Sequence, residues 1–294
     1  MTELLTGSTV PRRQLGRYLR DLRESAGLGM EQAARELELS RATLWRVEKG
    51  QVSVKVRDVR AMCVVYNATP QMTEVLIGLA GEAKAKGWWQ SYGDAVPDWF
   101  DLYVGLEAAA STLQWYEPLL IPGLFQSADY ARTVITENRP ELGAEETDRR
   151  VELRIARQTL LRRKVDVPAL DVLLNQSILD CPVGGPEIMA AQLDRLSEAG
   201  ELPNVSIRIV PPAAGFHLGL LTGSFVILRF PPSGNGAETE PPTVYADGFT
   251  GALYLDKRAE VERYRRAFDG IRELSLGQAE SMNLIHQTAE VLRK

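Results

Sequence analysis

The sequence predicts an α+β fold, with an all-helical amino-terminal domain at residues 1–86 and a larger mixed domain at residues 87–294. Three observations support this prediction. Apolar residues recur at helical spacing through the first 80 or so residues, whereas apolar and polar residues alternate as in strands only after Pro168. Between these regions the composition changes near Gly87, because residues 87–100 hold three of the five tryptophans.

Composition and charge place the chain among ordinary globular proteins. With 294 residues, of which 45% are hydrophobic and 25% charged, disordered and fibrous classes are excluded. The net charge is −5, but it is unevenly distributed. The first 80 residues carry 12 Lys and Arg against 9 Asp and Glu, whereas the remainder carries 22 against 30. We therefore expect the amino-terminal part to tolerate a polyanion and the rest to repel one.

Cysteine usage and hydropathy indicate the compartment. Cys63 and Cys181 lie far apart, so the chain offers neither a disulfide framework nor a CxxC metal-binding pair. No apolar run reaches the length of a membrane span, and the first residues lack the order of segments found in a signal peptide. We expect a cytoplasmic protein with no membrane association.

Five helices are predicted in the amino-terminal domain. The first has apolar residues at i, i+3, i+4 and i+7, and Gly27 ends it. The third begins after Ser40, a residue type that caps helix amino termini, and stops at Gly50. The predicted ranges are residues 12–26, 30–37, 41–49, 55–66 and 73–86.

The second domain is predicted to mix helices and strands. A helical pattern runs from about Asp98 to Leu113, and two prolines and a glycine forbid helix across residues 116–126. The proline- and glycine-rich segment 231–242 predicts a mobile exposed loop. Further helices are expected at about 129–138, 145–163, 258–274 and 276–292, and strands at about 170–174, 205–209, 224–230 and 243–246.

Residues 27–50 carry the most informative motif. Two short helices joined by a three-residue turn, with small Ala33 and Ala34 where the helices approach, form a helix-turn-helix. With the flanking helices, this stretch resembles the XRE type of DNA-binding domain of the phage-repressor family. Ser40, Leu44, Val47, Glu48 and Gly50 agree with that pattern. The resemblance implies a sequence-specific transcriptional regulator that binds a double-stranded DNA operator, and we expect a homodimer because one recognition helix contacts few base pairs.

The third helix presents the candidate DNA-contacting residues. Its outward positions are Arg41, Ala42, Thr43, Trp45 and Arg46. The resemblance places Arg41 and Ala42 where base-reading side chains sit, and arginine can bind guanine through two hydrogen bonds. Lys49 and Lys55 are better placed for phosphates. In the alternative interpretation, the cations only solvate a helix face. Trp45 either packs on sugar and phosphate or covers the first helix or a partner.

Other positions concern the framework of the motif. Gly29 and Met30 stand where the family usually has a polar cap and a glutamine, which predicts a missing contact to DNA. Glu38 occupies the turn position where glycine is common. By resemblance, Arg23 and Glu48 form a structural ion pair between the first and third helices.

The larger domain resembles the uncharacterised carboxy-terminal domain of actinobacterial, antitoxin-like regulators. The segments that carry this resemblance include residues 86–110, 116–132, 181–196, 203–211 and 251–255. It implies a small acidic protein partner encoded nearby. The alternative is a one-component regulator whose second domain senses a small molecule in an enclosed pocket.

Aromatic residues gather at the start of the second domain. Aromatic side chains are enriched in interface centres and ligand pockets. In the alternative interpretation they build the core of this domain. The partner or ligand candidates are Trp88, Trp89, Trp99, Tyr103, Tyr116, Phe125 and Tyr130.

Motifs of catalysis are lacking. His217 and His286 are the only histidines, and neither has metal-ligand spacing. The serines lack a GxSxG context, and the glycines near His217 do not have the spacing of a phosphate-binding loop. We expect a protein that is not an enzyme, with no cofactor, metal site or catalytic residue.

Overall fold

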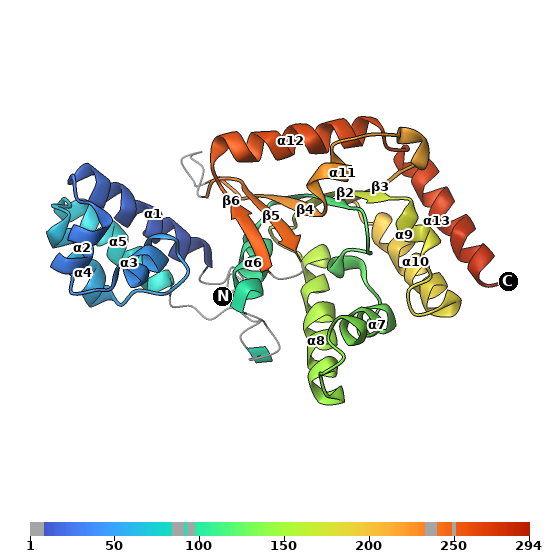
Figure 1. Ribbon diagram of the computed structural model, residues 1–294, viewed down its shortest axis with the longest axis horizontal. Helices are drawn as coiled ribbons and strands as arrows, with labels where there is room; N and C mark the ends of the chain where they lie inside the picture. Colours follow the sequence, from blue (N-terminus) through green and yellow to red (C-terminus); the bar gives the residue numbers. More distant parts are fainter. Residues whose placement is uncertain (1–8, 84–90, 93–97, 233–239, 249–250) are drawn as a thin grey trace. The chain divides into compact units, whose positions relative to one another are not determined.

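The computed structural model describes residues 9–83, 91–92, 98–232, 240–248 and 251–294 (Figure 1). The chain divides into two compact units. The first comprises Met1–Ser91, Phe100–Ala109 and Pro232–Glu240, and the second comprises Tyr92–Trp99, Ala110–Pro231 and Pro241–Lys294. The predicted domain boundary between residues 86 and 87 lies outside the described residues.

The five helices predicted for the amino-terminal region are confirmed. Gly27 ends the first helix in a left-handed conformation with φ +71°, and Gly50 follows the third with φ +65°. The fifth helix starts three residues earlier than predicted, because Thr69 caps it and Pro70 occupies its first turn. The helices are α1 (Thr9–Ser25), α2 (Met30–Glu36), α3 (Arg41–Glu48), α4 (Val56–Val65) and α5 (Pro70–Glu82).

One apolar core holds these five helices together. Leu15 and Leu19 of α1 meet Leu44 of α3, Met62 of α4 and Leu76 of α5, and all five side chains are fully buried. Ala33 and Ala34 let α2 approach this core closely, as expected for small residues. The core fixes which face of each helix remains outside.

The second unit is built on a six-stranded mixed sheet. Its spatial order is β3-β2-β1-β4-β5-β6, in which β1 to β3 are parallel and β4 to β6 antiparallel to their neighbours. The α+β prediction is therefore confirmed. The strands are β1 (Thr112–Glu117), β2 (Ala169–Asn175), β3 (Val205–Val210), β4 (Phe225–Arg229), β5 (Thr243–Gly248) and β6 (Gly251–Leu255).

Helices cover this sheet. The apolar face of α12 packs on it through Val261, Phe268 and Ile271, which meet Tyr116 and Phe225 (Figure 1). Helices α10 and α13 pack against each other and against β3, and α7 packs against α8. These helices are α7 (Ala128–Asn138), α8 (Ala144–Arg157), α10 (Pro186–Gly200), α12 (Arg258–Glu273) and α13 (Gln278–Leu292).

Short helical turns complete the second unit, and α6 (Asp98–Ala109) belongs to the first unit from Phe100 onward. The turns are η2 (Gly123–Phe125), η3 (Gln158–Arg162), α9 (Ser177–Asp180), η4 (Pro212–Ala214) and α11 (Gly219–Thr222). Because β1 and β4 pair antiparallel, the carboxyl end of β1 adjoins the start of β4. Loops from both strands therefore meet at this edge.

Several elements differ from the predictions. The helix expected to reach Leu113 ends at Ala109, and Leu113 lies in β1, a strand that its weak alternation concealed. The strand β6 and the helix α10 were also not predicted. The segment 231–242 was expected to be exposed throughout. This was wrong for Glu240, whose side chain is fully buried, because a carboxylate can be buried when cations pair with it.

Candidate nucleic-acid interface

The amino end of α3 is shaped by Ser40. Its Oγ accepts a hydrogen bond from the Thr43 backbone N–H at 3.0 Å and lies 2.8 Å from Thr43 Oγ1. This cap starts the helix and occupies the Thr43 hydroxyl. Leu44 and Val47 then turn inward, which fixes the rotation of α3 about its own axis.

The residues of α3 on the side opposite Leu44 and Val47 face outward. Arg41, Ala42, Trp45 and Arg46 are exposed, and Thr43 is half-buried. The Trp45 residue is 46% exposed, a large apolar side chain left partly in water beside two cations. Arg41 lies 3.6 Å from Glu31, but both side chains are 71% exposed, so this pair contributes little to stability and can exchange partners.

Further cations lie beyond the carboxyl end of α3. Lys49 caps α3, Lys55 caps α4, and both are exposed. Arg57, in the first turn of α4, is also exposed and was not among the predicted contacts. Its position two residues after Lys55 is the sequence feature from which this contact could have been predicted. Together these side chains offer donors for phosphates on either side of the 49–55 loop.

The position of α3 depends on a close approach to α1 at Gly16. A Cβ atom at this position would lie 2.6 Å from the Val47 carbonyl oxygen and 2.8 Å from the Glu48 carbonyl oxygen. These separations are shorter than any carbon–oxygen van der Waals contact. Only glycine permits this crossing, so the main chains of the two helices touch.

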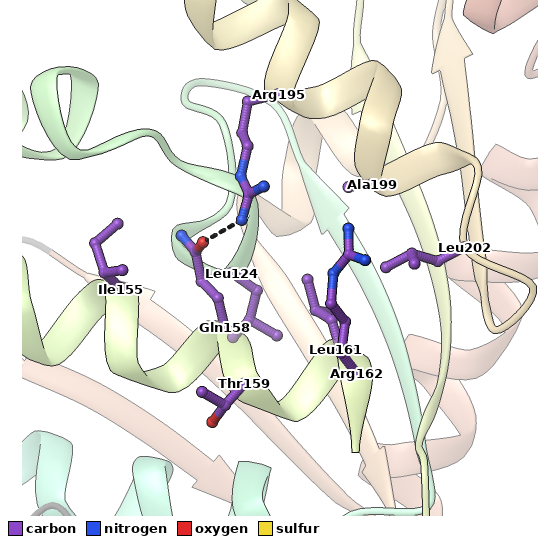
Figure 2. A pocket seen from close by; sticks show the side chains of 9 residues that line it. All are labelled: Leu124, Ile155, Gln158, Thr159, Leu161, Arg162, Arg195, Ala199 and Leu202. Carbon is purple, nitrogen blue, oxygen red and sulfur yellow. Dashed lines mark hydrogen bonds between the residues drawn. The ribbon is translucent and has the colours of Figure 1, made fainter. Parts of the chain in front are cut away.

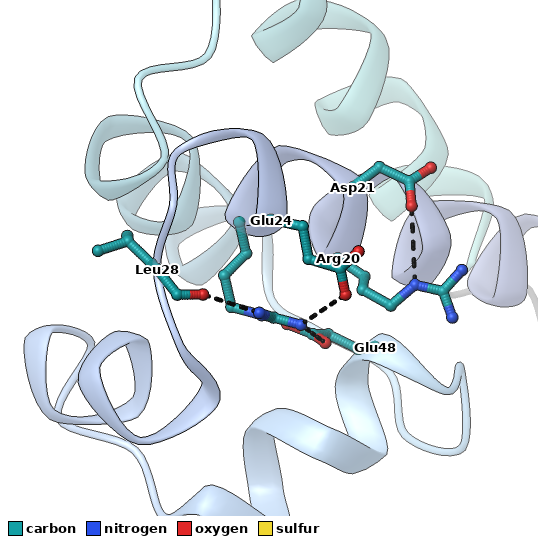
Figure 3. Close-up of polar contacts among 6 residues, drawn as sticks. Arg20, Asp21, Glu24, Leu28 and Glu48 are labelled. Carbon is teal, nitrogen blue, oxygen red and sulfur yellow. Dashed lines mark hydrogen bonds and ion pairs between the residues drawn. The ribbon is translucent and has the colours of Figure 1, made fainter.

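A buried ion pair strengthens the same crossing. Arg23 Nε donates to Glu48 Oε1 at 2.6 Å and Arg23 Nη2 donates to Glu48 Oε2 at 3.0 Å, and both residues are buried. The same guanidinium donates to the Leu28 carbonyl at 2.8 Å and to Glu24 at 3.2 Å (Figure 3). Hydrogen bonding of the guanidinium to the Glu48 carboxylate is the largest cause that raises the pKa of Arg23.

The structure accounts for two unusual residues of the motif, Glu38 in the turn and Gly29 at the start of α2. Glu38 adopts a left-handed conformation with φ +55°, which explains why glycine suits this position. Gly29 caps α2 without a side-chain hydrogen bond, so the amino end of α2 offers only backbone donors. Glu38 thus adds both strain and negative charge between the two helices of the motif.

A second acid packs on α1 within the first unit. Arg17 donates to both carboxylate oxygens of Glu240, at 2.6 and 2.9 Å, and Arg13 Nε lies 3.1 Å from Oε1. Glu240 is separated from Arg17 by 223 positions. No local sequence signal could have identified this contact.

Most predicted aromatic contacts of the second domain belong to the interior. Tyr103, Tyr116, Phe125 and Tyr130 are at most 1% exposed. Their assignment as partner contacts is therefore wrong, because side chains that form the packed core cannot reach a partner at the surface. Trp88 and Trp89 lie outside the described residues, as does the side chain of Trp99.

Among the described residues of the second unit, six exposed apolar side chains lie on two loops: the loop after β1 and the loop that leads through α11 into β4. Other exposed apolar residues, such as Val165, Leu253 and Val291, lie elsewhere. Glu117 joins these loops, because one carboxylate oxygen accepts from Ser224 Oγ at 2.6 Å and the other from Leu119 N–H at 3.4 Å. We call this surface the apolar edge. It comprises Leu119, Leu120, Phe216, Leu218, Leu220 and Leu221.

A half-buried carboxylate, Glu117, and a buried histidine, His217, lie beneath the apolar edge. Burial raises the pKa of Glu117, although the hydrogen bond from Ser224 opposes this shift. His217 is 6% exposed, contacts the Tyr116 ring edge to face, and has its pKa lowered by burial. A Cβ at Gly219 would lie 2.5 Å from the same ring, so α11 presses directly on Tyr116. The side chains directly beneath the apolar edge are therefore tightly packed around the Tyr116 ring.

The arrangement of α2, its turn and α3 defines a helix-turn-helix protein with an outward-facing cationic helix. Residues 14–76 match the family of helix-turn-helix domains. Residues 100–287 match the family described as Domain of unknown function (DUF5753), and the chain belongs to this family. No curated protein and no solved structure matches the chain.

The described part of the chain shows neither a metal-binding cluster nor a membrane-spanning helix. No group of three or more His, Cys, Asp or Glu side chains there is arranged to hold a metal ion. Within the same residues, no helix combines the length and apolarity needed to cross a bilayer.

Proposed function

We propose that the protein is a sequence-specific transcriptional regulator of the XRE type that inserts α3 into the major groove of an operator. It acts without catalysis and without a cofactor. The observation that supports this proposal is the exposure of Arg41 and Arg46 on a helix whose other face is fixed by Leu44, Val47 and Gly16. A rigid helix with exposed guanidinium groups is what base reading requires.

The double variant Arg41→Ala/Arg46→Ala tests this proposal. We expect its affinity for an operator selected from random duplexes by the wild-type protein to fall about 100-fold or more, since each base contact contributes about 1–3 kcal/mol. Both side chains are exposed, so folding should be unchanged. Arg20→Ala is the control, because Arg20 lies on α1 and pairs with Asp21 (Figure 3). Unchanged mobility-shift affinity for the double variant would refute the proposed reading face.

Operator recognition is proposed to need a homodimer. A single α3 of eight residues can reach only a few base pairs. Two copies on half-sites separated by about one DNA turn, roughly 34 Å, would supply the remaining specificity. The selected operator should accordingly contain an inverted repeat.

We further propose that the second domain, by analogy with antitoxins, binds a small protein partner through the apolar edge. Leu119, Phe216 and Leu221 are 74%, 72% and 72% exposed. The six side chains expose on the order of 600 Å² of apolar surface, compared with roughly 800 Å² that each partner contributes to a standard interface. This area is sufficient for the centre of a specific protein contact.

The variant Phe216→Asp/Leu221→Asp tests the apolar edge. The probe is the product of a small acidic reading frame adjacent to the gene, co-expressed with the full chain. We expect the double variant to lose the complex, because two charges cannot be buried unpaired in an apolar interface. Val291→Asp, at an exposed site on α13, should retain it. If the chain alone forms a dimer that the double variant dissociates, the edge is a self-association surface and the partner proposal fails.

A second candidate function is favoured by a cavity in the second unit. A space of about 220 Å³ lies between α8, η3 and α10. A site of this kind would make the protein a one-component regulator that responds to a small molecule. The two candidates use different surfaces and can be tested separately.

A further inference from the structure

The cavity of the second unit combines an apolar floor with cationic walls (Figure 2). The floor is formed by aliphatic side chains from η2, η3 and the carboxyl end of α10. The lining contains two arginines, and neither aspartate nor glutamate is among its residues. The lining residues are Leu124, Ile155, Gln158, Thr159, Leu161, Arg162, Arg195, Ala199 and Leu202.

The two guanidinium groups approach the cavity from opposite elements. Arg195 extends from α10 and its Nη2 donates to Gln158 Oε1 at 2.9 Å, which holds it across the opening. Arg162 extends from η3 toward Ala199 and Leu202 (Figure 2). Within the described residues, Arg162 has neither a hydrogen bond nor an ion pair. Arg162 is therefore an exposed residue whose guanidinium lies beside apolar side chains without a fixed partner.

The acidic residue paired with Arg195 does not prevent an anion from binding in the cavity. Arg195 Nη1 lies 3.3 Å from Glu198, but the Glu198 side chain is 62% exposed, so water weakens that pair. An anion in the cavity would accept from planar, fork-shaped donors, which favour carboxylates. The exposed Glu198 is a weak competitor for Arg195, whose own side chain is 38% exposed.

We propose that this cavity binds a carboxylate attached to a small apolar group, with Arg162 and Arg195 receiving the carboxylate and the leucines receiving the apolar body. A cavity of about 150 Å³ lined by apolar side chains can hold benzene, so about 220 Å³ suffices for an aromatic or branched aliphatic acid. The carboxylate could come from a free acid or from the carboxy terminus of a polypeptide. The inference rests on the second candidate function, for which it names the ligand class.

The experiment measures methyl NMR shifts of Leu124, Leu161 and Leu202 in the full chain. The probes are benzoate, benzamide, and an acetylated tetrapeptide ending in leucine as free acid and as amide. We expect saturable shifts with benzoate, at least tenfold tighter than with benzamide. A free-acid peptide that binds more tightly than benzoate identifies a polypeptide terminus as the source, and the reverse order identifies a free acid. Equal binding of benzoate and benzamide, or no shift with any acid, would overturn the proposal.

Variants locate the site. Arg162→Gln/Arg195→Gln should weaken benzoate binding at least tenfold, whereas Lys164→Gln removes an exposed cation that does not line the cavity and should have no effect. Thr159→Phe should block the opening with little effect on folding, because Thr159 is exposed. Equal losses for Lys164→Gln and the double variant would contradict a specific site. Methyl shifts without any change in operator affinity would support the site and refute the sensor function.

Discussion

Replacement of Glu48 with alanine is expected to lower the free energy of unfolding of the helical unit by about 3–5 kcal/mol. Arg23 would keep its bonds to Leu28 and Glu24 but would lose both hydrogen bonds to the buried carboxylate. A buried guanidinium without its counter-ion costs far more than the intact pair contributes. Because Glu48 lies at the end of α3, loss of the recognition helix should accompany the destabilisation.

Hydrogen exchange of amides in α1 and α3 measures this effect within the full chain. Glu24→Ala is a matched control, since Glu24 contacts the same guanidinium at 3.2 Å but is 60% exposed in its side chain. It should cost less than about 1 kcal/mol. The variant Arg23→Met/Glu48→Leu, which removes both charges, should recover most of the stability. Unchanged exchange rates in Glu48→Ala would show that the pair does not hold α3.

Replacement of Gly16 with alanine is the second large effect. The added methyl group would overlap the Val47 and Glu48 carbonyl oxygens, and backbone atoms cannot move aside as side chains do. We expect α1 and α3 to separate, at a cost of about 1–3 kcal/mol. Operator affinity should fall more than stability alone explains, because α3 would leave its position relative to the rest of the helical unit.

Gly78→Ala provides a control of opposite sign. Gly78 lies inside α5, and a Cβ there would meet no atom within 4 Å. Alanine is the better helix former, so this variant should gain about 0.5–1 kcal/mol. Unfolding of the full chain is followed by exchange in α1 and α5, and operator binding by mobility shift. If both glycine variants behave alike, close packing at Gly16 is not what positions α3.

Local sequence patterns predicted the helical unit well. Each of its helices has a regular apolar face, and caps such as Ser40 and glycines such as Gly27 lie within a few residues of the ends that they determine. The strand β1 was missed because it follows an alanine-rich helix and its alternation is broken by adjacent buried Trp115 and Tyr116. Pairing with β2 and β4, which local patterns do not report, decides its conformation.

The candidate sites also differ in how far local sequence patterns could predict them. The outward face of α3 depends on helical periodicity, so residue spacing predicted that Arg41 and Arg46 are exposed. Their role as DNA contacts was implied by the family resemblance. The pairing of Glu240 with Arg17 and the opposed guanidinium groups of Arg162 and Arg195 depend on contacts between distant segments. Aromatic composition pointed to a partner surface, but burial assigned Tyr116 and Phe125 to the core and left the leucines outside.

The backbone contact at Gly16 has a consequence for how this regulator could acquire new targets. Since the Gly16 contact and the inward side chains Leu44 and Val47 hold α3 in place, the outward positions 41, 42, 45 and 46 are not needed to keep it there. We expect that these positions can be varied together in a library with little change in melting temperature. Under the proposed function, variants with altered operator preference could then be selected without rebuilding the fold.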